Sequence, residues 1–264
     1  MRVRPAAVAG MFYPGSAHEL QAMVDRLLAA ADPGEAAPSP PVAVIVPHAG
    51  YVYSGPTAAT AYVRLLPWRE AITRVIAVGP AHHVPVHGLA LPSADGYATP
   101  LGVVPIDAAA RAELLRRDGV DIDDVAHAPE HSVEVQVPFL QRVLAPGWQF
   151  LPVVAGGASA AAVADALEPV WGAPGTLVVI SSDLSHYLDL ARARRIDRVT
   201  ADAIVRAAWE ELHSDQACGL VPIRGALELA RRHGHGVRLL DLRTSGDTAG
   251  PRDRVVGYGS FEIR

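Results

Sequence analysis

The chain has 264 residues, half of them hydrophobic, and a formal net charge of -5 at pH 7. This length suits one large α/β core or two small domains, and we expect a single domain over residues 1–264. The acidic balance provides no basic field for a polyanion, so nucleic acid is not an expected partner. Lysine and asparagine are absent, which excludes a Schiff-base lysine, a phosphate-loop lysine and a papain-like asparagine.

Cysteine content and apolar runs indicate the compartment. The one cysteine, Cys218, has no partner in the chain for a disulfide, and residues 1–16 lack the apolar core of a signal peptide. The longest apolar stretches, such as 42–46, are far shorter than the roughly 20 residues of a membrane helix. We therefore expect a cytoplasmic protein without a membrane segment.

The predicted elements begin with a helix and then alternate between strands and helices. Ser16 and Glu19 form a capping-box pattern that opens a helix to about Ala31. The strands predicted after it lie at 42–46, 74–79, 150–154, 176–180, 237–242 and 254–263. Helices are expected at about 57–66, 132–144, 159–170 and 196–213, and 89–106 reads as a hairpin or irregular insertion. This β-α-β order predicts an α/β fold with a mostly parallel central sheet flanked by helices on both faces.

Three apolar strands end in residues that bind metals or move protons. The strand at 42–46 leads to His48, the strand at 74–79 leads to His82 and His83, and the strand at 176–180 leads to Asp183 and His186. The carboxyl ends of parallel strands share one edge of a sheet, so these side chains should converge there. Neutral imidazole suits zinc, iron and copper, and a mixed ligand set leaves positions open for water or substrate.

Several of these residues have a plainer interpretation. Neighbouring side chains on an extended backbone point in opposite directions, so only one of His82 and His83 should enter the site. His131 and Glu134 share a helix face at i,i+3, where an exposed helix start and a site role remain open. Cys218 is a small buried hydrophobe or a thiolate ligand. The remaining histidines are predicted to be solvated: His18, His87, His127, His213, His233 and His235.

Six motifs in order along the chain resemble the Memo family. They are Ala9-Gly10-Met11-Phe12-Tyr13-Pro14, Pro47-His48-Ala49-Gly50-Tyr51, Gly79-Pro80-Ala81-His82-His83, Glu130-His131-Ser132-Val133-Glu134, Ser181-Ser182-Asp183-Leu184-Ser185-His186 and Cys218-Gly219. The resemblance implies a fold like that of the class III extradiol dioxygenases, with one transition-metal ion held by His48, His82 and Cys218. It also places Asp183 and His186 in the pocket as catalytic residues, and it favours a site role for His131 and Glu134.

The implied ligand set differs from the two histidines and one carboxylate of extradiol enzymes. A thiolate donates more charge than a carboxylate and is oxidisable, which favours iron or copper, with zinc as a further option. The first functional hypothesis is therefore a redox or dioxygenase-like enzyme that acts on a small-molecule substrate. The alternatives are a non-catalytic metal-binding partner protein, for which the name of bacterial family members implies a radical SAM enzyme, a metal-dependent hydrolase, and a metal-free hydrolase with Cys218 or Ser182 as nucleophile.

Overall fold

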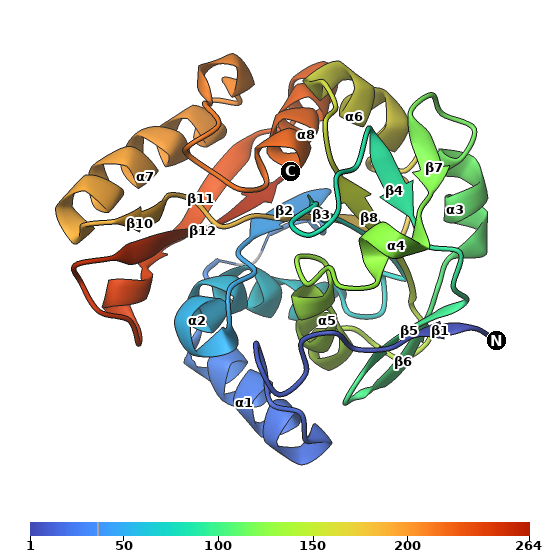
Figure 1. Cartoon of the computed structure of the whole chain (residues 1–264), viewed down its shortest axis with the longest axis horizontal. Coiled ribbons are helices and arrows are strands. Elements are labelled where there is room, and N and C mark those ends of the chain that lie inside the picture. Colours follow the sequence, from blue (N-terminus) through green and yellow to red (C-terminus); the bar gives the residue numbers. More distant parts are fainter. Residues whose placement is uncertain (36) are drawn as a thin grey trace.

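The computed structural model describes residues 1–35 and 37–264 (Figure 1). In this part of the chain, the central sheet has nine strands. They are β2 (Ala43–Val46), β3 (Arg74–Pro80), β4 (Leu89–Leu91), β7 (Val120–Ile122), β8 (Gln149–Ala155), β9 (Thr176–Ser181), β10 (His186–Leu188), β11 (Val237–Thr244) and β12 (Val255–Ile263). The strand order is β10-β12-β2-β9-β3-β8-β4-β7, and β11 pairs with β12. The four central strands β2, β9, β3 and β8 are parallel, whereas β12 and β4 run antiparallel beside them.

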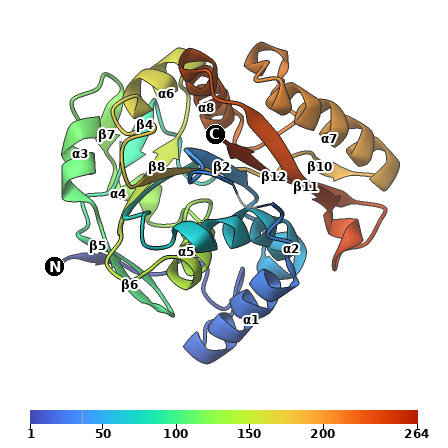
Figure 2. The ribbon, with the colours of Figure 1, turned by 180° about the vertical axis from the view of Figure 1, so that it is seen from behind.

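Helices cover both faces of this sheet, as predicted. They are α1 (Ala17–Ala30), α2 (Tyr51–Tyr62), α3 (Ala108–Leu114), α4 (Asp124–His127), α5 (Val137–Val143), α6 (Ala160–Leu167), α7 (Leu190–Val205) and α8 (Leu220–His233). Short 3-10 turns lie at Val63–Trp68, Glu134–Gln136, Trp209–Glu211 and Ser245–Asp247. Helices α1, α2 and α5 pack together on one face, and α6, α7 and α8 lie on the other (Figures 1 and 2). The single α/β domain is therefore a layered structure with a mixed sheet at its centre.

The predicted insertion at 89–106 is divided between two sheets. Its first part is β4 of the central sheet, and its second part is a hairpin of β5 (Gly96–Thr99) and β6 (Gly102–Pro105). Strand β1 (Val3–Arg4) pairs with β5 and completes a small three-stranded sheet.

Two helices differ from the prediction. Helix α2 begins at Tyr51 and contains Pro56, whereas the prediction placed the start after that proline. Proline removes one backbone hydrogen bond, but near a helix start the burial of Tyr51 and Ala58 outweighs this loss. Helix α8 was not predicted, and it matters for the site because Cys218 directly precedes it.

The core is continuous and lies on both faces of the parallel strands. Every residue of β2 and β9 is buried, which rigidly fixes the strand ends that lead into His48 and Asp183. No helix in the described part of the chain is both long enough and apolar enough to cross a membrane.

Candidate metal centre

The carboxyl ends of the parallel strands open into one pocket of about 910 Å³. His48 follows β2, His82 follows β3 and Asp183 follows β9, as predicted from the strand order. Cys218 arrives at the same pocket from the start of α8. Other lining residues come from the N-terminal segment, the turn before Glu134 and the β10–β12 region: Phe12, Tyr53, His131, His186, Tyr187, Asp215, Arg254 and Tyr258.

Three ligand atoms converge at the base of this pocket. One ligand atom from each of His48, His82 and Cys218 lies within 4.8 Å of the others, and Cys218 Sγ lies 3.2 Å from His48 Nε2. Two ligands at about 2.0 and 2.3 Å from one ion would lie roughly 3.1–3.6 Å apart for angles between about 90° and 110°. The spacing therefore fits a transition-metal ion. His83 is exposed and belongs to no such group in the described residues.

The hydrogen bonds of Ser181 determine which nitrogen of His48 is free. The Ser181 hydroxyl donates to the carbonyl oxygen of Ser132 at 2.6 Å and accepts from Nε2 of Gln136 at 2.7 Å. His48 Nδ1 lies 2.9 Å from the same hydroxyl oxygen. Because the hydroxyl has one proton and has already donated it, Nδ1 of His48 must be the donor. The lone pair of His48 is then on Nε2, which faces Cys218.

Gln136 supports this assignment because its own orientation is determined. Its Nε2 also donates to the carbonyl oxygen of Pro47 at 3.0 Å, and its Oε1 accepts from the hydroxyl of Tyr62 at 2.8 Å. A flipped amide would direct two oxygens at each other beside Pro47. The chain from Tyr62 to His48 is thus a neutral network with every donor used.

His82 is held by a carboxylate instead. Glu130 is 1% exposed, and its Oε1 lies 2.9 Å from Nδ1 of His82. Burial opposes ionisation of Glu130, but hydrogen bonds from the ring and backbone of His82 and from the backbone of Ser132 outweigh it and hold the pKa of Glu130 below its ordinary range. The carboxylate therefore accepts the Nδ1 proton, and Nε2 of His82 is free to bind a metal. Sequence reasoning placed Glu130 on an exposed helix start, and its position before His131 was the one available signal.

A second group with ligand spacing shares one member with the first. His82, Glu130 and His131 also offer atoms within 4.8 Å of one another. Glu130, however, already accepts backbone N–H groups from His82, His131 and Ser132, so it functions as an anchor rather than as an open ligand. The His131 ring stacks on His82 with centroids 4.6 Å apart, and burial is the main reason that its pKa falls to about 4.

A glycine allows Cys218 to approach the sheet. A Cβ on Gly219 would lie 2.6 Å from the Ser181 carbonyl oxygen and from Ser182 Cβ, so a larger residue would push α8 away. Burial and the nearby carboxylate of Asp183 raise the pKa of the Cys218 thiol to about 12. A bound cation reverses this preference because it stabilises the thiolate.

Asp183 and His186 line the pocket beside the ligands. Oδ1 of Asp183 accepts the backbone N–H of His48 at 2.8 Å. Burial raises the pKa of Asp183 to about 7, although hydrogen bonds from the His48 and Ala49 backbone oppose that shift. Burial lowers the pKa of His186. Both groups therefore change protonation within the range that general acid–base chemistry uses.

Glu134 lies under the site rather than in it. Its carboxylate is fully buried, accepts the hydroxyl of Tyr13 at 2.5 Å and the backbone N–H groups of Ala7 and Val8 at 2.8 and 3.0 Å, and pairs with Arg4. It is not among the residues that line the pocket. The contacts of Glu134 instead fasten the N-terminal segment, including Phe12, beside His131.

The prediction that His127 is solvated is wrong. His127 is 1% exposed, and its Nε2 donates to the carbonyl oxygen of Ala90 at 2.8 Å. The four-residue helix α4 packs against β4, which the sequence pattern did not indicate. His18, His87, His213 and His233 are exposed, and His235 is half-buried.

Comparisons with known proteins identify the family. A family model described as "Memo-like protein" matches residues 4–262. A "MEMO1 family protein" of Aquifex aeolicus is 38% identical and covers 98% of each chain, and one of Archaeoglobus fulgidus is 36% identical over 99% of this chain and all of its own. Among solved structures, an uncharacterized protein of Escherichia coli K12 shares the fold at a TM-score of 0.53 and 14% identity, covering 84% of this chain and 99% of its own. The chain therefore belongs to the Memo-like protein family.

Proposed function

We propose that this protein binds one transition-metal ion through His48, His82 and Cys218 and uses it for redox chemistry on a small aromatic molecule. The observation that supports this proposal is the convergence of two free imidazole Nε2 atoms and one thiol, each held by neighbouring groups. Iron or copper suits a set that includes a thiolate, and zinc is the redox-inert option. When bound, the ion supplies Lewis-acid or redox chemistry at its open positions.

The protein groups around those positions would orient the substrate and move protons. His186 is the proposed proton acceptor, because its pKa is lowered and it lines the pocket. Asp183, with its pKa near 7, would exchange protons at neutral pH. His131 would form a wall between His82 and Phe12 that excludes water from one side. We assign Glu134 no proton transfer, because its oxygens are occupied by the N-terminal segment.

Oxygen uptake with a catechol tests this function. Protein loaded anaerobically with iron(II) should consume oxygen when catechol is added, and His186→Ala should retain its metal but lose about 10²-fold or more in rate. His83→Ala is the matched control, because His83 is a nearby exposed imidazole outside the ligand group. Full metal loading without uptake in the parent protein, or an unchanged rate in His186→Ala, would contradict the proposal.

A second candidate function is a metal-binding partner protein. Large apolar side chains are exposed at or beside the mouth of the pocket: Met11, Val52, Tyr53 and Tyr187. Such groups favour a protein surface over water and would suit a partner, for which the radical SAM enzyme of the initial hypothesis is a candidate. Metal binding without turnover, together with complex formation that Met11→Ser and Val52→Ser both weaken, would favour this function over catalysis.

A further inference from the structure

An arginine stacked on a tyrosine lies in the wall of the metal pocket. Arg254 directly precedes β12, and its guanidinium carbon lies 4.6 Å from the centre of the Tyr187 ring. Tyr187 comes from β10, which pairs with the start of β12 through His186 and Val256. Both side chains line the pocket that holds His48 and Cys218. Neither was recognised in the sequence as a binding residue.

The backbone at Tyr187 is held in an unusual conformation. Its φ of 60° is in the left-handed region, and within the described residues only one other non-glycine residue, Ala207, has a positive φ. The register of β10 against β12 shifts between His186 and Leu188, so Tyr187 is the bulged residue. Bulges of this kind redirect a side chain and are frequent beside functional sites. Here the bulge places a 63% exposed ring beneath the guanidinium of Arg254.

The guanidinium of Arg254 has no anionic partner in the part of the chain that the structure describes. No carboxylate oxygen lies within 4.0 Å of it, and none of its N–H groups forms a hydrogen bond there. Stacking covers one face of the guanidinium but leaves the N–H groups at its edge available. Those groups match the two oxygens of a carboxylate.

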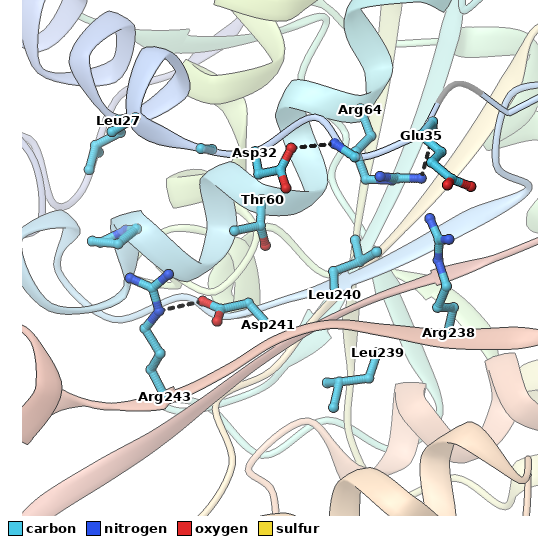
Figure 3. Close-up of a pocket in the computed structure, with 14 residues that line it drawn as sticks. Leu27, Asp32, Glu35, Thr60, Arg64, Arg238, Leu239, Leu240, Asp241 and Arg243 are labelled. Atoms are coloured by element: carbon cyan, nitrogen blue, oxygen red, sulfur yellow. Dashed lines mark hydrogen bonds and ion pairs between the residues drawn. The ribbon is translucent and has the colours of Figure 1, made fainter.

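Arginines in another pocket show the contrast. A pocket of about 520 Å³ beside α1, α2 and β11 is lined by Arg64, Arg238 and Arg243 (Figure 3). Arg243 pairs with Asp241 at 2.8 Å, and Arg64 and Arg238 both pair with Glu262, at 2.9 and 2.6 Å. Protein carboxylates therefore already neutralise the cations of that pocket.

The charge balance of the metal pocket selects the ligand. Arg254 is the one arginine among its described lining residues, and Asp183 and Asp215 also line it. A dianion such as a phosphate monoester would be repelled by both carboxylates, whereas a monoanion could pair with Arg254 at a lower electrostatic penalty. A carboxylate is the monoanion whose planar geometry fits the guanidinium edge.

We propose that the pocket takes a small aromatic substrate that carries a carboxylate, and that Arg254 on its Tyr187 platform binds this carboxylate. This inference rests on the proposed function, because it assumes that the ring binds beside the metal ligands. The carboxylate would orient the ring so that its other end faces His48, His82 and Cys218. Substrates without the anionic group would bind more weakly.

Two probes measure this preference on metal-loaded protein. We expect calorimetry to give a dissociation constant for 3,4-dihydroxybenzoate about 10-fold or more below that for catechol, the size of one charge-assisted bidentate contact. Arg254→Gln should reduce that ratio to about 2-fold or less. Arg254→Lys, which keeps the charge but loses the planar edge, should give an intermediate ratio. Arg252→Gln is the matched control, because Arg252 is exposed nearby but does not line the pocket, and it should keep the full ratio.

Each failure has a distinct signature. Equal affinity of the parent protein for both probes, with normal oxygen uptake, would overturn the carboxylate site and leave the proposed function standing. A preference that persists in Arg254→Gln would overturn the assignment to Arg254. Loaded protein that binds neither probe and consumes no oxygen would overturn the proposed function and this inference with it.

Discussion

The two histidines of the candidate metal centre present the same nitrogen but are held by different chemistry. His48 is 2% exposed and donates to Ser181, the end of a neutral network through Gln136. His82, with a side chain 28% exposed, donates to the carboxylate of Glu130. An anionic acceptor makes an imidazole more basic than a neutral acceptor does. The difference indicates that the His48 side determines the position of a metal, while the His82 side determines how much charge the metal receives.

Replacing the carboxylate should have the largest effect. Glu130→Gln keeps the size of the side chain, but its amide cannot accept every N–H group that Glu130 now accepts. We expect metal affinity, measured by competition with a chelator, to fall about 10- to 100-fold. The control is Asp215→Asn, which removes an exposed carboxylate from the same pocket and should change affinity less than about 2-fold. Equal losses in both variants would refute a specific role for the anion.

Removing the neutral acceptor should have a smaller effect. Ser181→Ala leaves Nδ1 of His48 without its acceptor and allows the other tautomer, in which Nε2 carries the proton. We expect metal affinity to fall by about 10-fold or less, because no charge is lost. Tyr62→Phe removes a hydrogen bond at the far end of the network and should leave affinity within about 2-fold. If Ser181→Ala matched or exceeded Glu130→Gln, the proposed division of roles would be wrong.

The strand ends of the site were predictable from the sequence, but the groups that hold the ligands were not. Continuous apolar runs identified β2, β3 and β9, and the parallel arrangement brought His48, His82 and Asp183 to one edge. Cys218 entered the set through the family resemblance alone, because helix α8 was missed and a lone cysteine carries no spacing signal. Ser181 lies within an apolar strand, and Glu130 lies before a turn. Their roles depend on tertiary contacts that no local pattern encodes.

A third buried imidazole extends the comparison to a carbonyl partner. Burial lowers the pKa of His127 to about 4, against a smaller opposing contribution from the hydrogen bond to Ala90; Arg4 also lowers it, whereas Asp123 and Asp124 raise it. Between its unfolded value of about 6.5 and that folded value, only the unfolded chain binds a proton at His127, so its contribution to stability is lost as pH falls.

The measurement is the free energy of unfolding at pH 7 and pH 6. The parent protein should lose about 0.7 kcal/mol more than His127→Gln over that interval. His18→Gln, at an exposed position on α1, should behave like the parent protein. A His127→Gln variant with the same pH dependence as the parent would show that His127 does not remain neutral in the folded state.

Elemental analysis tests the central claim most directly. Untagged protein purified without oxygen should contain about one iron or copper ion per chain, and His48→Ala and Cys218→Ser should lose most of it while they remain folded. His83→Ala should keep the parent ratio, because His83 lies outside the ligand group. A parent protein far below one metal per chain that takes up none on titration, or unchanged ratios in both ligand variants, would contradict the metal centre.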